Sequence, residues 1–75
     1  MSLEGRTCYR VMFVRDHWVV QLESGAIDST YVAQQTAVAA ARSMARAHWI
    51  LYGASSYVEV ELPDGSITKD YAFGV

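Results

Sequence analysis

The stretch from Cys8 to Glu23, CYRVMFVRDHWVVQLE, constrains the fold most strongly because it can pair with itself in only one register. A tight turn at Arg15-Asp16 places opposite each other all residues whose numbers sum to thirty-one. One face of the hairpin then carries three wholly apolar pairs: Phe13 with Trp18, Val11 with Val20, and Tyr9 with Leu22. A slip of one residue would break every pair, so the sequence predicts an antiparallel hairpin with this face buried. Arg-Asp is unfavourable in a primed two-residue turn, but a four-residue loop keeps the same register.

The other face of this hairpin carries apolar residues that a buried core does not require. They are Met12, Val14 and Val19, whose side chains alternate with those of the buried face. A cluster of exposed apolar side chains rimmed by polar groups marks an interaction surface more often than chance decoration. The sequence therefore predicts an interface on the outer sheet face, to which two aromatic residues of a second hairpin also contribute. The predicted interface residues are Met12, Val14, Val19, Tyr57 and Tyr71.

After a stretch that we interpret as a loop, ESGAIDST from Glu23 to Thr30, the apolar period becomes helical. Three small residues recur every four positions: Ala37, Ala41 and Ala45. This stripe predicts a helix from about Ala33 to a point between His48 and Tyr52, with an axis that lies close to a sheet. Gly53 is expected to end the helix in the left-handed conformation.

The last third of the chain, YVEVELPDGSITKDYAF, alternates with period two on either side of a turn signal, PDG. Two registers are open. A two-residue turn at Asp64-Gly65 gives these pairs: Leu62 with Ile67, and Glu59 with Asp70. A type I turn from Pro63, with Gly65 in a bulge, gives these: Glu59 with Lys69, and Tyr57 with Tyr71. Turn chemistry and charge favour the second register, and in both the same residues face the helix: Val58, Val60 and Leu62.

These elements predict a small two-layer α+β domain in the order β-β-α-β-β, with an antiparallel sheet and one helix packed on one face. The chain has 75 residues, which is enough for one domain. We interpret residues 8–75 as that domain, and residues 1–7, which begin MSLEG, as a disordered leader or vector-derived residues.

Composition places the chain among folded proteins. Hydrophobic residues make up 52% and charged residues 19%, whereas disordered chains show the opposite balance. A single cysteine, Cys8, rules out an internal disulfide and favours a reducing, cytoplasmic setting. No apolar run approaches the roughly 20 residues that cross a bilayer, so we expect no membrane association.

Several motifs resemble those of short bacterial proteins grouped as domain of unknown function 2188. They are YRV from Tyr9, WVV from Trp18, AVAAARSMAR from Ala37 to Arg46, DGSI from Asp64 and YAFG from Tyr71, and the resemblance covers roughly residues 8–74. It supports the predicted fold and implies no reaction, cofactor or catalytic residue. Where that family usually has a threonine N-cap, this chain has Ala33, so capping falls to Ser29 or Thr30, or is absent.

No arrangement of residues indicates catalysis or a bound cofactor. Cys8, His17 and His48 are the only soft metal-ligand types, and none of their spacings forms a chelating pair. No spacing predicts that Cys8 lies within reach of an imidazole, as a thiol nucleophile needs. The carboxylates of the second hairpin are expected to be solvated: Glu59, Glu61, Asp64 and Asp70. The glycines form no phosphate loop, so we expect no enzyme activity, metal or cofactor.

The leading hypothesis is a non-enzymatic protein-interaction module that forms a homodimer through the outer sheet face. An unknown protein is the other possible partner for that face. The alternative function is weak nucleic-acid binding, because exposed aromatic rings can stack on bases: Tyr57, Tyr71 and Phe73. Six Lys and Arg against eight Asp and Glu give a net charge of −2, which argues against that alternative.

Overall fold

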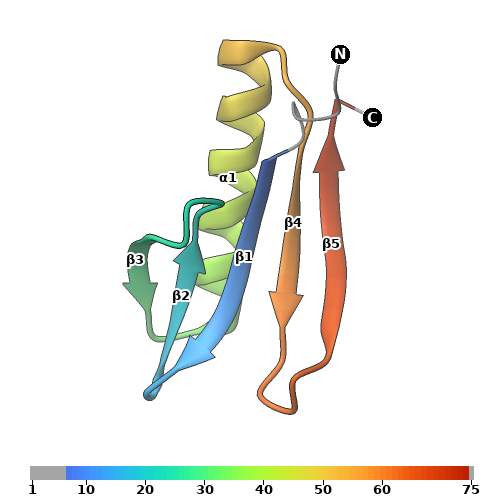
Figure 1. Cartoon of the computed structure of the whole chain (residues 1–75). Coiled ribbons are helices and arrows are strands. Elements are labelled where there is room, and N and C mark those ends of the chain that lie inside the picture. The colour runs from blue at the N-terminus through green and yellow to red at the C-terminus, as the bar shows by residue number, and fades with distance from the viewer. Residues whose placement is uncertain (1–6, 75) are drawn as a thin grey trace.

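A computed structural model describes residues 7–74 and shows a five-stranded sheet with one helix across one face (Figure 1). The elements are β1 (Thr7–Val14), β2 (His17–Gln21), β3 (Ile27–Tyr31), α1 (Gln34–Tyr52), β4 (Ser56–Glu61) and β5 (Ile67–Phe73). The strands lie side by side in the order β3-β2-β1-β4-β5. Thr7 belongs to β1, one residue before the domain start expected from the sequence, and the rest of the expected leader, residues 1–6, lies outside the described residues.

The predicted two-layer α+β architecture is confirmed, but the sheet is mixed rather than purely antiparallel. Residues 27–30, which belong to the loop expected from Glu23 to Thr30, form the edge strand β3 together with Tyr31. This extra strand reverses the chain once more before α1, and the helix then returns it to the end of the sheet where β1 begins (Figure 1). As a result, β4 enters beside β1 and runs parallel to it.

The predicted register of the first hairpin is confirmed for two of its three apolar pairs: Val11 with Val20, and Phe13 with Trp18. The third pair does not form, because β2 ends at Gln21 and Leu22 begins the next turn. The strands are joined by the two-residue turn at Arg15 and Asp16, whose φ angles are 51° and 72°. Both residues are therefore left-handed, as a type I′ turn requires, although neither is glycine.

The hairpins β2–β3 and β4–β5 are closed by the same kind of turn, and both carry the pattern Leu-x-x-Gly-x-Ile. Gly25 donates its N–H to the carbonyl of Leu22 (2.9 Å), and Gly65 donates to that of Leu62 (2.8 Å). In both turns the leucine N–H donates to the carbonyl of the residue after the glycine, at 2.8 Å. The glycine φ angles of 95° and 92° lie in a region that other residues rarely adopt. The expected bulge turn at Gly65 is thus confirmed.

Each of these two hairpins also contains a β-bulge, which leaves one residue of the edge strand unpaired. In β3 that residue is Asp28. In β5 it is Asp70, which separates two pairs: Glu59 with Lys69, and Val58 with Tyr71. The first pair agrees with the favoured register. The predicted pair of Tyr57 with Tyr71 is wrong, because the extra residue shifts the alternation of faces beyond it.

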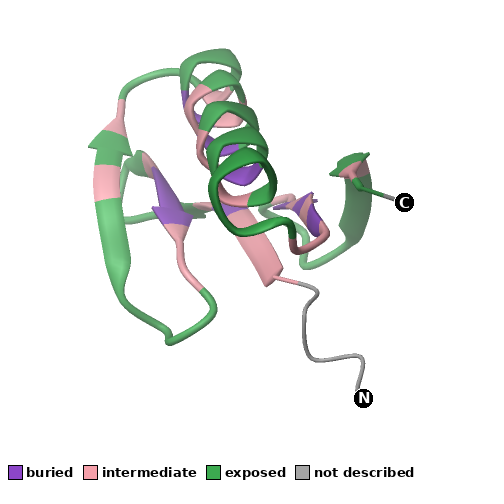
Figure 2. Ribbon diagram, turned by 90° about the horizontal axis from the view of Figure 1, so that it is seen from above, coloured by how far each residue is buried: buried purple, intermediate pink, exposed green. Residues whose placement is uncertain are grey.

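The core lies between α1 and the side of the sheet that faces it (Figure 2). The three alanines of the helix stripe, Ala37, Ala41 and Ala45, are fully buried there. They pack in one cluster with buried valines of β1, β2 and β4: Val11, Val20 and Val58. Gly53 ends the helix in the left-handed conformation (φ 67°), as predicted, and its N–H donates to the carbonyl of Trp49 at 2.8 Å. At the other end Ala33 provides no side-chain cap, which was one of the open alternatives.

Candidate functional site

Four of the five predicted interface residues lie on the outer face, the side of the sheet away from α1: Met12, Val14, Val19 and Tyr57. Val19 is only 4% exposed there, because it is flanked by its cross-strand neighbours Met12 and Thr30. Met12 is half-buried, and Val14 at the end of β1 is 39% exposed. Met12, Val14 and Val19 therefore offer a partner little continuous apolar surface. Two further exposed apolar residues of this face, Ile27 (47%) and Ile67 (49%), lie apart from each other on the two edge strands.

Charged groups occupy the centre of the outer face. Arg10 Nη2 lies 2.9 Å from Glu59 Oε1, and Arg10 Nη1 lies 3.7 Å from Glu61 Oε1. The hydrogen bond to Glu59 raises the pKa of Arg10 above its usual value. The half-buried ring of Tyr57, the fourth predicted interface residue, has Lys69 Nζ 5.1 Å from its centre in a cation–π contact. A partner on this face would have to desolvate paired charges, which costs free energy.

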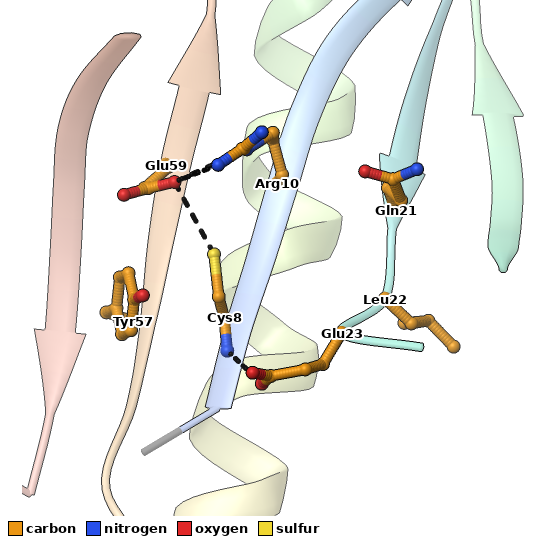
Figure 3. Close-up of a pocket in the computed structure, with 7 residues that line it drawn as sticks. All are labelled: Cys8, Arg10, Gln21, Leu22, Glu23, Tyr57 and Glu59. Carbon is orange, nitrogen blue, oxygen red and sulfur yellow. Dashed lines mark hydrogen bonds and ion pairs between the residues drawn. The ribbon is translucent and has the colours of Figure 1, made fainter. Parts of the chain in front are cut away.

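A shallow depression of about 330 Å³ also lies on the outer face (Figure 3). It is lined by residues of β1, β2, β4 and the turn after β2: Cys8, Arg10, Gln21, Leu22, Glu23, Tyr57 and Glu59. The backbone N–H of Cys8 donates to Glu23 Oε1 (3.0 Å), and Cys8 Sγ donates to Glu59 Oε1 (3.6 Å). Figure 3 shows the Glu59 carboxylate bonded to both Cys8 and Arg10. Cys8, Arg10, Glu23 and Glu59 are thus linked to one another by hydrogen bonds. Gln21 Nε2 donates to the carbonyl of Gly25 at 3.3 Å.

Cys8 is held as a thiol at neutral pH. Burial raises its pKa, a hydrogen bond with Tyr57 lowers it, and the negative charge of Glu59 raises it again, with a net upward shift. Because the thiolate is the nucleophile and the metal ligand, this environment does not activate Cys8 for either role.

The hydrogen bonds of the two histidines are with groups other than the Cys8 thiol. His17 Nδ1 is 2.7 Å from the carbonyl oxygen of Arg15, and His48 Nε2 is 3.1 Å from the hydroxyl of Thr7. Within residues 7–74, no three His, Cys, Asp or Glu side chains are grouped so that they could hold a metal ion. The fold therefore does not bring the three soft-ligand residues together.

Tyr71 lies on the helix side of the sheet, so its assignment to the outer face is wrong. The guanidinium carbon of Arg42 on α1 is 5.6 Å from the centre of its ring, and the ring of Phe73 is 4.9 Å away. Arg42 Nε also donates to Asp70 Oδ2 at 2.7 Å. The bulge at Asp70 explains the error, because without it Tyr71 would share the face of Lys69.

Four consecutive apolar residues are exposed at the C-terminal end of α1: Trp49 (40%), Ile50 (60%), Leu51 (72%) and Tyr52 (71%). We call these residues the helix-end patch. A helix that covers a sheet needs apolar residues on one side only, so the run WILY exceeds what the core requires. This excess of apolar residues is the feature of the sequence that indicates an exposed apolar surface at the end of the helix.

Other aromatic residues support the helix-end patch. Trp49 stacks on Phe73 of β5, with ring centres 6.1 Å apart, and Tyr52 lies 5.0 Å from the ring of His48. On the other side of the helix an open groove of about 300 Å³ runs between α1 and the sheet. It is lined by Tyr9, Leu22, Asp28, Met44, Ala47, His48, Leu51 and Tyr52. The patch therefore continues into a mainly apolar groove.

The helix-end patch lies in an uncharged part of the sequence. Residues 47–58 contain no Asp, Glu, Lys or Arg, and Arg46 and Glu59 are the nearest charged residues on either side. Despite this apolar end, no helix within residues 7–74 combines the length and hydropathy needed to span a membrane.

Comparisons of the chain with protein-family models, curated proteins and solved structures find no match. The resemblance to domain of unknown function 2188 therefore stays a prediction from the motifs.

Proposed function

We propose that the chain is a non-enzymatic protein-interaction module that forms a homodimer through the helix-end patch. The observation that carries this proposal is the 40–72% exposure of four consecutive apolar residues on a helix. Each of these residues has an accessible surface of about 150–250 Å² when it is fully exposed, so the four together expose about 500 Å². These side chains are spread around the last turn of the helix, and exposed apolar surface on this scale in a small protein typically marks a binding surface.

The size of the patch suits a weak dimer. Full cover of both patches would bury about 1,000 Å² in total. One contact buries less than that because consecutive helix residues point about 100° apart, so the interface falls in the range of weak, transient complexes. Trp49 and Tyr52 belong to the residue types that concentrate binding energy at interfaces. We therefore expect a dissociation constant in the micromolar range, because area alone does not secure tight binding.

The two other routes to self-association have less support. On the outer face, Val19 is already covered and the Arg10–Glu59 ion pair lies at the centre. The edge strands β3 and β5 are interrupted by bulges at Asp28 and Asp70, a feature that discourages pairing between sheet edges. We therefore keep the homodimer of the sequence analysis and move its interface to the end of α1.

The alternative of nucleic-acid binding has no specific observation in its favour. Arg10 and Arg42 are each bonded to a carboxylate, at 2.9 Å and 2.7 Å, so a phosphate would have to compete with Glu59 or Asp70. The protonated state of Cys8 supports a non-enzymatic role. We also infer a cytoplasmic location, because a single cysteine suits a reducing compartment.

Light scattering behind a sizing column tests the homodimer. At about 100 μM the wild-type protein should show twice the 8.3 kDa chain mass, and the mass should fall on dilution. Leu51→Glu should give a folded monomer, because a carboxylate inside an apolar contact is desolvated without a partner. Circular dichroism checks that the helix persists in this variant.

Val32→Glu is the matched control, because Val32 is 95% exposed but lies outside the helix-end patch. It adds the same charge and should leave the dimer intact. Val14→Glu tests the outer face in the same way and should also leave the dimer intact. A wild-type protein that stays monomeric to submillimolar concentration would refute the proposal, and so would dissociation by Val14→Glu but not by Leu51→Glu.

A further inference from the structure

We propose that the two-fold axis of the dimer passes beside Ile50, so that the C-terminal turns of two antiparallel α1 helices pack against each other, an arrangement that we call tail to tail. This inference rests on the homodimer proposed above. Ile50 is the middle of the helix-end patch. Trp49 turns toward β5, where it stacks on Phe73, and Leu51 turns to the other side, where it lines the groove with Tyr9. Ile50, which is 60% exposed, projects between them.

Symmetry and charge favour this position of the axis. A two-fold axis brings each nearby side chain against its own copy, so a charged group beside the axis would meet a like charge. With the axis beside Ile50 and the helices antiparallel, Ile50 packs against its own copy, Trp49 and Leu51 flank it on either side, and none of them is charged. Arg46 then lies at the rim of the contact, where water and salt screen it.

An axis nearer the middle of the helix is the main competing arrangement. The outward side of α1 carries small exposed residues there, Ala39 and Ser43. An axis beside Ser43 would bring Arg46 inside the contact. It would also place Ile50 opposite the polar start of the partner helix, near Thr36. The charges and the apolar surface therefore both favour Ile50 as the centre.

Single-cysteine variants distinguish the two axes. Ile50→Cys and Ser43→Cys are each made together with Cys8→Ser, so that only the introduced thiol can cross-link. A disulfide requires Cα atoms within about 7 Å. With the axis beside Ile50, the two Ser43 Cα atoms are about 21 Å apart along the antiparallel helices, since each residue rises 1.5 Å.

Under mild oxidation, Ile50→Cys should form a covalent dimer about tenfold or more faster than Ser43→Cys, because the dimer holds its thiols at high effective concentration. Non-reducing gels measure both rates. Leu51→Cys should be trapped more slowly than Ile50→Cys, because its side chain points about 100° away from the axis, but faster than Ser43→Cys, so it is a second probe if loss of the Ile50 side chain weakens the dimer.

The outcomes separate this inference from the proposed function. Faster trapping of Ser43→Cys, or equal trapping of Ser43→Cys and Ile50→Cys, would overturn the tail-to-tail axis. A wild-type dimer in light scattering with no trapping at positions 50 and 51 would also overturn the axis but leave the homodimer intact. A monomeric wild-type protein would refute the homodimer itself.

Discussion

The hairpins β2–β3 and β4–β5 share a turn, but they use the residues beyond it differently. Both turns have the pattern Leu-x-x-Gly-x-Ile and the same two backbone hydrogen bonds. The bulge follows at once after Ile27 in β3, at Asp28, but only three residues after Ile67 in β5, at Asp70. In each case the bulge moves the tyrosine four residues after the isoleucine to the helix side of the sheet: Tyr31 and Tyr71.

The two tyrosines nevertheless have different surroundings. Tyr31 packs against the core, and its hydroxyl is 2.6 Å from that of Ser29. Tyr71 is 52% exposed and lies against Arg42 and Phe73. The comparison shows that the turn sequence sets the pairing close to the turn. Whether a residue farther from the turn packs into the core depends on the position of the bulge and on how much of the strand α1 covers.

Replacement of the two tyrosines should give the largest contrast between the hairpins. We expect Tyr31→Ala to lower the free energy of unfolding by about 2–3 kcal/mol and Tyr71→Ala by about 1 kcal/mol or less, because only Tyr31 packs against the core. Urea unfolding of both variants measures the difference. Equal losses would contradict the difference in packing described above.

Replacement of the two turn glycines should instead show how similar the hairpins are. Gly25→Ala and Gly65→Ala should each cost about 1–2 kcal/mol, because alanine is strained at positive φ. A Cβ at either position would meet no atom within 4 Å, so the cost comes from the backbone alone and should be the same in both. The same urea experiment tests this, and clearly unequal costs would show that the turns are not equivalent.

The smallest expected effect is a difference in acid sensitivity. Asp64 accepts hydrogen bonds from the N–H (2.9 Å) and the hydroxyl (2.7 Å) of Ser66, whereas Ser24 in the other turn accepts only from the N–H of Ala26 (3.3 Å) through an uncharged oxygen. The bonds from Ser66 lower the pKa of Asp64 below its ordinary value of 3.8. A lowered folded-state pKa gives stabilisation that is complete above the ordinary value and is lost as pH falls through the folded value.

We therefore expect Asp64→Asn to reduce the loss of unfolding free energy below pH 3.8, while Ser24→Ala leaves that pH dependence unchanged. Urea unfolding at a series of acidic pH values measures both variants. If Asp64→Asn has the same acid dependence as the wild type, the Ser66 bonds do not stabilise the charged carboxylate.

The features that could be predicted from the sequence are those with a local and regular signal. The Val11–Val20 pairing follows from alternation around a short turn, and the buried alanine stripe follows from its period of four. The strand β3 was missed because IDSTY is short and mostly polar. Its turn, LESGAI, nevertheless matches LPDGSI, and that repeat was the available signal.

The candidate site was harder to predict because it depends on what other elements cover. Val19 alternates like an exposed residue, but cross-strand neighbours bury it. Tyr71 changes face because of a bulge that leaves no trace in the alternation. Leu51 looks like one more residue at the end of an apolar helix, and its exposure follows only from how far α1 extends over the sheet.

The central position of β1 has a consequence for how the chain can be made. β1 pairs with β2 across a two-residue turn, but it pairs with β4 only after the whole of α1 has been synthesised, with Thr7 beside Ser56. A partly folded chain in which β1, β2 and β3 have paired but β4 has not docked therefore leaves one edge of β1 open. Partly folded chains with open apolar edges are prone to aggregation and are typical clients of chaperones.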